Sequence, residues 1–256
     1  MRHVARRAEA LGYASLWTFQ RVLHPAGAPA QPVFDPVLAL AHVAGHTTRI
    51  RLGTATLCAP FTAPALLAKA LTSLDVLSGG RLTVGLGMGW MAEEYAAAGV
   101  PFARRGARMD EYLRCLTALW MQDPVEFAGE FYTVPRSHMA PRPVQRPHPP
   151  LLLGGTAAPA LRRAGRLAQG WIASSRHDPA GLGPSIALVR EGAREAGRDP
   201  DTLQIVVRLV DAPSPEALAA LRAQGVTDVF VDLNVAATTP TLEHAERVLE
   251  AFAPTT

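Results

Sequence analysis

The stretch GGRLTVGLGMGWMAEEYAAAG, residues 79–99, combines an apolar run with three glycines at alternate positions, Gly85, Gly87 and Gly89. A dinucleotide-binding loop needs the spacing G-x-G-x-x-G, and Trp90 occupies the position of its last glycine. Glycines at alternate strand positions leave one face bare, which lets a planar ligand or a neighbouring backbone approach. Spacing leaves two interpretations equally open: a strand that lines a flat cofactor, or glycines that relieve crowding beneath a Trp90 that covers the core.

A second glycine-rich turn lies within PPLLLGGTAAPALRRAGRLAQGW, residues 149–171. An apolar strand ends at Gly154 and Gly155, and Thr156 is expected to cap a helix that has Pro159 in its first turn. Backbone N–H groups at a helix start can bind an anion such as a phosphate. The alternative is an ordinary strand-to-helix turn that binds nothing.

Three polar side chains, Gln20, Arg21 and His24, follow the apolar segment of SLWTFQRVLHP, residues 15–25. Any of them could form a hydrogen bond with a substrate. Arg21 stays charged, so it is suited to binding an anion or polarising a carbonyl but not to transferring protons. His24 stands in a stretch rich in glycine and proline, which is more typical of a loop residue than of a general base.

Several other kinds of chemistry lack support in the sequence. Cys58 has no neighbouring His or Lys and is predicted to pack facing the pocket with low reactivity. The eight histidines show no metal-binding spacing and two cysteines cannot form a zinc site, so no metal is predicted. The single lysine, Lys69, lies in a helical pattern, which argues against Schiff-base enzymes. Asp232 and Glu93 could serve a glycosidase, but nothing in the sequence brings them together.

Length and composition indicate a single soluble globular domain, residues 1–256. The chain is close to the ~250 residues of a typical (β/α)8 barrel, and 48% of it is hydrophobic. No apolar run approaches the ~20 residues of a membrane span, and the N-terminal MRHVARRAEALGY lacks the apolar core of a secretory signal. Arginines are scattered and no basic stripe is interleaved with aromatic residues. We expect a cytoplasmic protein that acts on a small molecule, without nucleic-acid or membrane partners.

Strand-length apolar runs alternate with helical periodicity, which is typical of a parallel α/β sheet, either open or closed. The predicted strands are 14–19, 50–57, 81–87, 150–155, 170–174, 203–210 and 227–233. The predicted helices are 2–11, 36–47, 63–77, 104–121, 157–169, 180–197, 214–224 and 241–252. Glu93 and Glu94 are expected to open a further helix, where their charge favours the helix dipole.

This series begins with a helix, whereas a closed eight-stranded barrel needs one more strand, before residue 2. We hypothesise that the first strand is missing from this sequence. A stable folded protein whose native N-terminus is Met1 would contradict that hypothesis. The segment 122–150 departs from the alternation and is predicted to form a hairpin turning at Gly129, followed by a proline-rich extended loop over the active-site face.

Taken in order, the motifs resemble those of the luciferase-like monooxygenase superfamily. The segments that carry the resemblance are RRAEALGYASLW, RIRLGTATL, LLAKALTSLDVLSGGRLTVGLGMGW, RGARMDEYLRCLTALW, EFAGEFYTVPRS and PRPVQRPHPPLLLGGTAAPALRRAGRLAQGWI. They are most similar to the branch of F420-dependent oxidoreductases. The resemblance runs from about residue 2 to 175, and residues 176–256 share only the general pattern.

The resemblance implies a (β/α)8 TIM barrel of the bacterial-luciferase type with coenzyme F420, or alternatively FMN, at the carboxyl ends of the strands. It implies that the segment around Leu57 and Cys58 forms a bulge behind the cofactor ring, often with a non-prolyl cis peptide. It also implies a set of residues around the cofactor, namely Gln20, Leu57, Cys58, Gly87, Met88, Gly89, Trp90, Gly154, Gly155 and Thr156. The last three of these are expected on its phosphate side. Family members are expected to form homodimers.

The sequence departs from the sugar-phosphate dehydrogenases of this superfamily, whose Asp-His pair and Glu correspond here to Gln20, Arg21 and Trp90. The same acid–base scheme is therefore not expected, and the proton donor is unassigned, with Arg21-bound water or His24 as candidates. The main hypothesis is F420-dependent hydride transfer to or from a small organic substrate. The alternatives are an FMN-dependent monooxygenase that uses O2, a non-catalytic flavin-binding barrel or inactive truncated homologue, and a metal-free barrel hydrolase. Specificity is expected to lie in loops 22–35 and 122–149.

Overall fold

The fold is a parallel α/β barrel, seen in a computed structural model that describes residues 1–27, 32–174, 177–210, 213–233 and 241–254. Seven strands pair in parallel in the order β1-β2-β4-β7-β8-β9-β10. Their bounds are Ser15–Thr18, Arg51–Thr54, Leu82–Gly87, Leu151–Gly154, Gly170–Ala173, Gln204–Leu209 and Asp228–Val231. A two-residue strand, β3 (Leu57–Cys58), pairs with β4. All seven predicted strands are confirmed, and the predicted strand 50–57 is divided at a cis peptide between Ala55 and Thr56.

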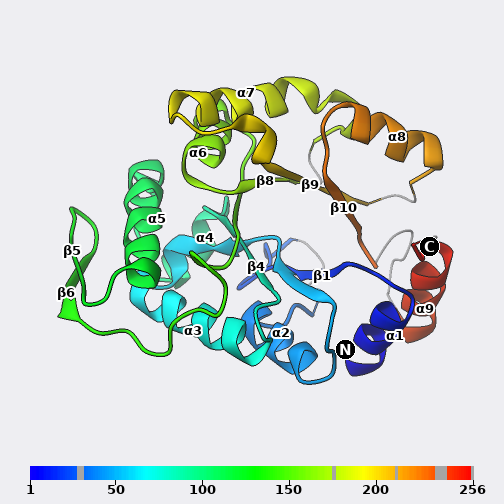
Figure 1. The fold of residues 1–256 in the computed structure, drawn as a ribbon, viewed down its shortest axis with the longest axis horizontal. Coiled ribbons are helices and arrows are strands. Elements are labelled where there is room, and N and C mark those ends of the chain that lie inside the picture. The colour runs from blue at the N-terminus through cyan, green and yellow to red at the C-terminus, as the bar shows by residue number, and fades with distance from the viewer. Residues whose placement is uncertain (28–31, 175–176, 211–212, 234–240, 255–256) are drawn as a thin grey trace.

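Helices surround these strands, as Figure 1 shows. Their bounds are α1 Arg2–Ala10, α2 Pro36–Ala44, α3 Pro64–Leu77, α4 Ala92–Ala97, α5 Arg105–Met121, α6 Ala158–Leu167, α7 Gly183–Glu195, α8 Pro215–Ala223 and α9 Leu242–Ala251. The eight predicted helices and the short one opened by Glu93 and Glu94 are all present. Within the described ranges no helix combines the length and the apolar character required to cross a lipid bilayer.

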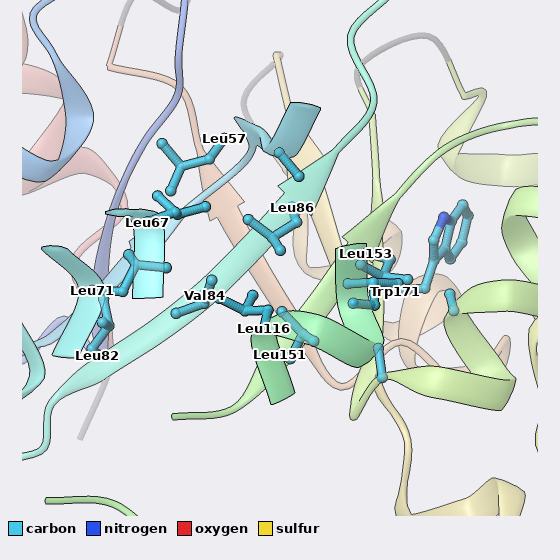
Figure 2. Close-up of a cluster of buried hydrophobic side chains, with 14 of the residues drawn as sticks. Leu57, Leu67, Leu71, Leu82, Val84, Leu86, Leu116, Leu151, Leu153 and Trp171 are labelled. Atoms are coloured by element: carbon cyan, nitrogen blue, oxygen red, sulfur yellow. The ribbon is translucent and has the colours of Figure 1, made fainter. Parts of the chain in front are cut away.

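The main hydrophobic core lies between the strands and the helices that cover them. Leu82, Val84 and Leu86 of β4 alternate with inward-facing residues and contact this outer core. Leu71 of α3 and Leu116 of α5 pack into the same cluster (Figure 2). All five side chains have essentially no exposed surface, and burying each contributes about 1.5–3 kcal/mol relative to leaving it in water.

A second, smaller core fills the inside of the barrel. Leu152, Ile172 and Val206 form a buried cluster there, with Trp17 and Phe230 packed against it. The ring of Trp17 stacks on that of Phe230 at 5.3 Å between centroids. Side chains of β1 and β10, the first and last strands of the sheet, are therefore in contact. The described residues of these two end strands are not paired with each other, and the barrel is nearly closed.

Two glycines make room for this inner layer. A side chain at Gly53 of β2 would collide with the indole of Trp17, which lies directly against the glycine backbone. A side chain at Gly85 of β4 would collide with the carbonyl oxygen of Thr54 and with the end of Ile172. The crowding interpretation of the alternate glycines is therefore correct for Gly85.

Helices α1 and α9 lie side by side on the outside of the barrel, next to the end strands (Figure 1). Arg7 of α1 bonds the carboxylate of Glu250 of α9 at 2.7 Å, on the exposed side of the pair. The hydroxyl of Tyr13 donates to the carbonyl oxygen of Leu249 at 2.9 Å, nearer the core. Segments from the two halves of the chain thus cover the same part of the barrel wall.

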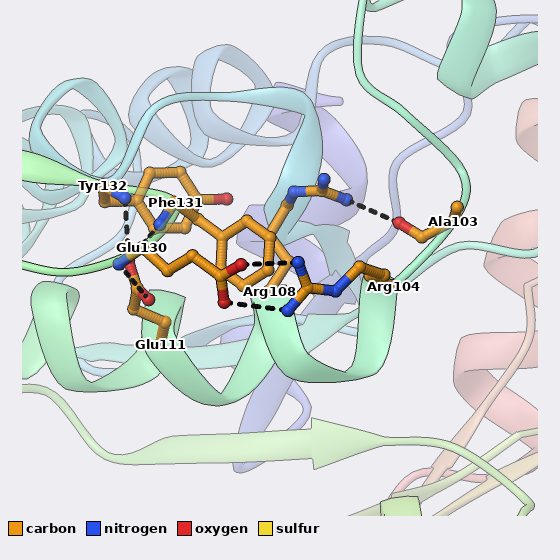
Figure 3. Close-up of polar contacts among 7 residues, drawn as sticks. All are labelled: Ala103, Arg104, Arg108, Glu111, Glu130, Phe131 and Tyr132. Atoms are coloured by element: carbon orange, nitrogen blue, oxygen red, sulfur yellow. Dashed lines mark hydrogen bonds and ion pairs between the residues drawn. The ribbon is translucent and has the colours of Figure 1, made fainter.

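The predicted hairpin is confirmed as β5 (Val125–Ala128) and β6 (Thr133–Ser137), which pair antiparallel. The buried carboxylate of Glu111 on α5 accepts backbone N–H bonds from Glu130, Phe131 and Tyr132, all at 2.7–2.8 Å (Figure 3). Arg104 forms a two-fold ion pair with Glu130 at 2.5 and 2.8 Å. The turn of the hairpin is therefore fixed to α5 mainly through its backbone.

Another carboxylate ties α1 to the start of β2. Glu9 accepts N–H bonds from Thr48, Arg49 and Ile50, the shortest at 2.7 Å from Arg49. Burial opposes ionisation of Glu9, but the bonds from Ile50, Arg49 and Thr48 outweigh it and lower the pKa to about 2, from the usual 4.5. The ionised side chain satisfies three backbone donors that no strand partner reaches.

We predict that Glu9→Gln lowers the free energy of unfolding at pH 7 by about 1–2 kcal/mol, measured by urea denaturation. The folded pKa lies below the usual 4.5, so the carboxylate contributes fully above pH 4.5 and its contribution is lost as the pH falls towards 2. The difference between wild type and variant should therefore shrink in acid. Glu243→Gln, at an exposed ion pair of α9, is the matched control and should change stability by less than about 0.5 kcal/mol. An equal loss in both variants would contradict the role of Glu9.

We predict that Gly85→Ala destabilises the fold by about 3 kcal/mol or prevents folding, because the new methyl group would meet backbone that cannot move aside. Gly183→Ala is the control, since its methyl group would enter open space at the start of α7. Alanine there should be neutral or stabilising by up to about 1 kcal/mol. Thermal unfolding of both variants measures the difference, and a Gly85→Ala protein as stable as wild type would refute the crowding account.

Candidate active site

The carboxyl ends of the parallel strands meet at one mouth of the barrel, where catalytic residues of such folds are found. The segment after β1 is bonded there to the segment between β2 and β3. Gln20 donates its backbone N–H to the carbonyl of Thr56 at 3.2 Å, and its side-chain oxygen accepts from the backbone N–H of Cys58 at 2.8 Å. Gln20 therefore fixes the backbone of the predicted bulge.

The wall beside this segment is formed largely by glycine backbone. A side chain at Gly87 would lie 2.7 Å from the hydroxyl oxygen of Thr56, and one at Gly154 would lie 3.2 Å from its methyl carbon. Thr56 thus stands between the ends of β4 and β7 and fills the space that both glycines leave. Thr56 was not among the predicted site residues, and its place between the cis peptide and the bulge gives it this central position.

The chain turns sharply after β4 at Gly89, whose φ of +71° favours glycine. A side chain there would lie 3.2 Å from the sulfur of Cys58, so the turn packs closely on the bulge. Trp90 follows and is 51% exposed. About half of its surface therefore borders the mouth, where Arg21 lies over its ring.

Two of the predicted side chains point away from the mouth. Leu57 is buried in the outer core, and Met88 packs partly buried against that core. Side chains alternate along a strand, so Leu57 faces away from the side of Cys58 in β3 and Met88 faces away from the side of Gly87 at the end of β4. Any contribution of Leu57 and Met88 to a bound ligand would come from their backbone atoms.

Arg21 is held beside Trp90 by a buried carboxylate. Glu94, on the first turn of α4 and 2% exposed, bonds Arg21 at 3.2 Å. The same carboxylate accepts backbone N–H bonds from Val22 at 2.7 Å and Leu23 at 3.2 Å. The guanidinium lies 5.4 Å from the Trp90 ring centroid, within the range of a cation–π contact. Glu94 therefore joins residues 21–23, after β1, to the start of α4 in one rim of the mouth.

The thiol of Cys58 is kept in its protonated form. Burial and, to a lesser extent, the negative charge of Glu94 raise its pKa to about 12, although Arg21 partly opposes the increase. A protonated thiol is a weak nucleophile and a poor metal ligand. The geometry thus agrees with Cys58 as a packing residue beneath the Gly89 turn.

The second glycine-rich turn leads into α6. The predicted cap at Thr156 is wrong, because the helix begins one residue later and Ala157 occupies the N-cap position without a side-chain bond. Thr156 is exposed, and Trp171 bonds the carbonyl of Gly155 at 2.9 Å. Pro159 has no N–H and the N–H of Ala160 bonds the carbonyl of Ala157 at 2.8 Å, so among the first three residues of α6 it is Ala158 whose N–H could bind an anion.

The structure thus brings Gln20, Arg21, Cys58, Gly89 and Trp90 together and links them through Thr56 to the glycines of β4 and β7. His24 lies further along the loop after β1 and is partly buried. In the described ranges no three His, Cys, Asp or Glu side chains gather closely enough to hold a metal ion.

A second group of residues at the mouth was missed. Arg208 of β9 forms an ion pair with Asp232, just after β10. Its guanidinium also lies 5.4 Å from the ring centroid of Phe19, just after β1. The sequence signal for this group was Arg208 itself, a charged residue inside the otherwise apolar segment LQIVVRLV. Asp232 was considered only as a glycosidase carboxylate, and its ion-pair partner was not identified.

Comparison with known proteins gives matches over almost the whole chain. A sequence profile described as luciferase-like monooxygenase matches residues 1–252. An uncharacterised protein of Mycobacterium tuberculosis is 35% identical over 269 residues, which cover 98% of this chain and 92% of that protein. The FMNH2-dependent dimethylsulfone monooxygenase of Pseudomonas putida is 30% identical over 199 residues, covering 77% of this chain and 54% of that enzyme.

Solved structures match the fold over the same extent. The monooxygenase RslO1 of Streptomyces bottropensis superposes with a TM-score of 0.80 and 25% identity, covering 98% of this chain and 90% of its own. The coenzyme F420 dependent tetrahydromethanopterin reductase of Methanopyrus kandleri superposes with a TM-score of 0.79 and 18% identity, covering 98% and 93%. These likenesses support the expected barrel of the luciferase type.

We predict that neither cysteine of the folded protein reacts with iodoacetamide at pH 8, because burial raises the pKa of Cys58 to about 12 and that of Cys115 to about 11. Both should react fully in urea, which mass spectrometry of tryptic peptides can follow. Glu94→Gln removes a charge that raises the Cys58 pKa, so it should speed alkylation of Cys58 and leave Cys115 unchanged. Rapid modification of Cys58 in the native wild type would show that its thiol is not buried as described.

Proposed function

The chain belongs to the family of luciferase-like monooxygenases, whose members are flavin- or F420-dependent oxidoreductases, and we propose that this one uses coenzyme F420 for hydride transfer. When bound, the deazaflavin would carry a hydride to or from a carbonyl, imine or alcohol carbon of a small organic substrate. The support for F420 is the resemblance of the motifs between residues 2 and 175 to the F420-dependent branch.

The observation that carries a flat cofactor is the glycine-lined half of the barrel mouth. Gly87 and Gly154 lie against Thr56, whose side chain fills the space in front of them, so the wall formed by these three residues carries no side chain larger than threonine. A planar ring system can approach such a wall closely, as it could not approach projecting side chains. The residues present therefore fit a flat tricyclic group.

The remaining residues of the rim would border that group. Trp90 offers an exposed aromatic face, and the backbone around Cys58 is fixed by Gln20. The start of α6 after Gly154 and Gly155 would take the phosphate side, where the N–H of Ala158 is left for an anion. Arg21 is suited to an anionic or carbonyl oxygen but not to proton transfer, so the proton donor is left unassigned.

A second candidate is an FMN-dependent monooxygenase, which would oxygenate its substrate with dioxygen and reduced FMN. The P. putida relative, described as FMNH2-dependent, favours this alternative at 30% identity. The glycine-lined wall suits either ring, since the two cofactors share their flat shape. The third candidate is a barrel that binds a cofactor but catalyses no reaction, and the experiment must distinguish it from the two enzymes.

We predict that F420 binds and that Trp90→Ala weakens its binding about 2- to 10-fold, because an aromatic contact contributes roughly 0.5–1.5 kcal/mol. Quenching of ligand fluorescence measures the affinity for F420 and for FMN in parallel titrations. Leu77→Ala, which removes an exposed apolar side chain at the end of α3, is the control and should bind F420 like wild type.

The same preparations distinguish the reactions. Reduction of carbonyl or imine substrates by reduced F420 without oxygen would support hydride transfer, whereas binding of FMN alone with substrate-dependent oxygen uptake would replace it with the second candidate. Binding of neither cofactor would contradict the proposal. Light scattering of these samples tests the homodimer that we propose with this function.

A further inference from the structure

The outward sides of α2 and α3 carry large apolar side chains that remain exposed to solvent in the described structure. Leu38 of α2 is 72% exposed, and Leu66 and Leu77 of α3 are 67% and 71% exposed. The two helices are neighbours on the outside of the barrel (Figure 1). Single exposed leucines are ordinary on a protein surface, whereas a contiguous apolar face marks an interaction site.

These leucines belong to two lines of residues, one on each helix, with the spacing that packs helices against one another. The line on α3 consists of Leu66, Ala70, Ser73 and Leu77. The line on α2, which starts just before the helix and ends just after it, consists of Phe34, Leu38, Ala41 and Gly45. Both repeat at intervals of four, three and four residues, and none of their members is buried. This repeat aligns side chains along one side of a helix, as in coiled coils and four-helix bundles.

The packing of the barrel itself uses the opposite side of each helix. Leu40 and Val43 of α2 belong to the outer core, as do Leu67, Leu71 and Leu74 of α3. Each helix therefore has one apolar side that covers the strands and a second apolar side that points away from them. We call the two outward lines together the α2–α3 face.

The α2–α3 face is also free of charge. Among the helices of the described ranges, α2 alone lacks Asp, Glu, Lys and Arg. The charged residues of α3 lie outside its line: Lys69 reaches the carbonyl oxygen of Ala140, and buried Asp75 accepts from the backbone of Val144. The hydroxyl of Ser73 donates to the carbonyl of Lys69 at 2.8 Å, so it needs no partner from outside the helix. Such a face can meet an identical one without opposing like charges.

The face is large enough for a dimer. Taken as half-cylinders about 10 Å wide with a rise of about 1.5 Å per residue, helices of 9 and 14 residues present about 550 Å². An identical face would bury as much again, so the interface would total about 1,100 Å², near the lower limit for stable association. A two-fold axis places the same surface on both partners, and the equal spacing of the two lines suits such self-pairing.

We propose that two copies of this chain associate through the α2–α3 face, so that four helices pack around a two-fold axis. Leu38, Leu66 and Leu77 would then be covered by the other copy. The proposal gives the homodimer a defined surface. It does not rest on the cofactor or the reaction, because none of the residues of this face belongs to the candidate active site.

Sedimentation velocity of the full chain over a micromolar concentration series tests this surface. Wild type should dimerise, and Leu38→Glu and Leu66→Glu should each weaken the dimer at least about tenfold, because each would bury a carboxylate with no cation opposite. Leu242→Glu, at an exposed position that begins α9, is the matched control and should dimerise like wild type. Since all three positions are exposed, thermal unfolding of dilute samples should show that the variants remain folded.

Mixing two monomeric variants provides a second test that a folding defect could not imitate. The double variants Leu38→Glu/Leu66→Glu and Leu38→Lys/Leu66→Lys should each remain monomeric alone and form a heterodimer together, because opposite charges then face one another. A wild type that stays monomeric at high micromolar concentration would overturn the proposal, as would folded variants that dimerise like wild type or oppositely charged variants that fail to associate. A wild-type dimer that depends on this face but binds neither F420 nor FMN would instead refute the proposed function alone.

Discussion

The interior of the barrel is filled by one layer of contacts on which the shape of the mouth depends. Trp17 lies against the bare backbone of Gly53 and stacks on Phe230, so residues from three strands share one packed unit. Gly85 lets the carbonyl of Thr54 approach just above it. Close packing of this kind transmits small displacements rather than absorbing them. Thr56, Gly87 and Arg208 lie nearer the mouth than this packed layer, and the layer therefore determines their positions.

Carboxylates that accept backbone N–H bonds hold the loops on this frame. Glu9 does so for the start of β2, Glu94 for the loop after β1, and Glu111 for the turn of the hairpin. Asp75 of α3 accepts from the backbone of Val144 and Gln145 in the proline-rich loop. Bonds to an ionised acceptor are stronger than neutral ones, which suits segments that lack strand partners. These bonds tie the described part of the rim of the candidate site to the barrel beneath it.

The sequence predicted the elements well because their signals are local. Apolar runs and helix periodicity located every strand and helix to within a few residues, and Gly129 marked the hairpin turn. The predictions were less accurate where tertiary contacts determine the local structure. The N-cap of α6, for example, is Ala157 instead of Thr156. Arg208 and Asp232 are 24 residues apart, and only the pairing of β9 with β10 brings them together. Leu57 and Met88 have the expected positions in the chain, but strand alternation turns their side chains outward.

The anchoring of the hairpin by Glu111 has a consequence for how such a protein diversifies. The carboxylate contacts the N–H groups of residues 130–132, and an N–H group is the same for every amino acid but proline. The attachment is therefore largely indifferent to the side chains that the hairpin displays. Substitutions at the exposed positions of β5 and β6 would leave these bonds to α5 in place (Figure 3), whereas Val125, Phe127 and Val134 also pack against the core. In such a scaffold, the exposed side chains of the hairpin can change the chemistry of the outer surface, while the backbone bonds that attach the hairpin to the barrel stay the same.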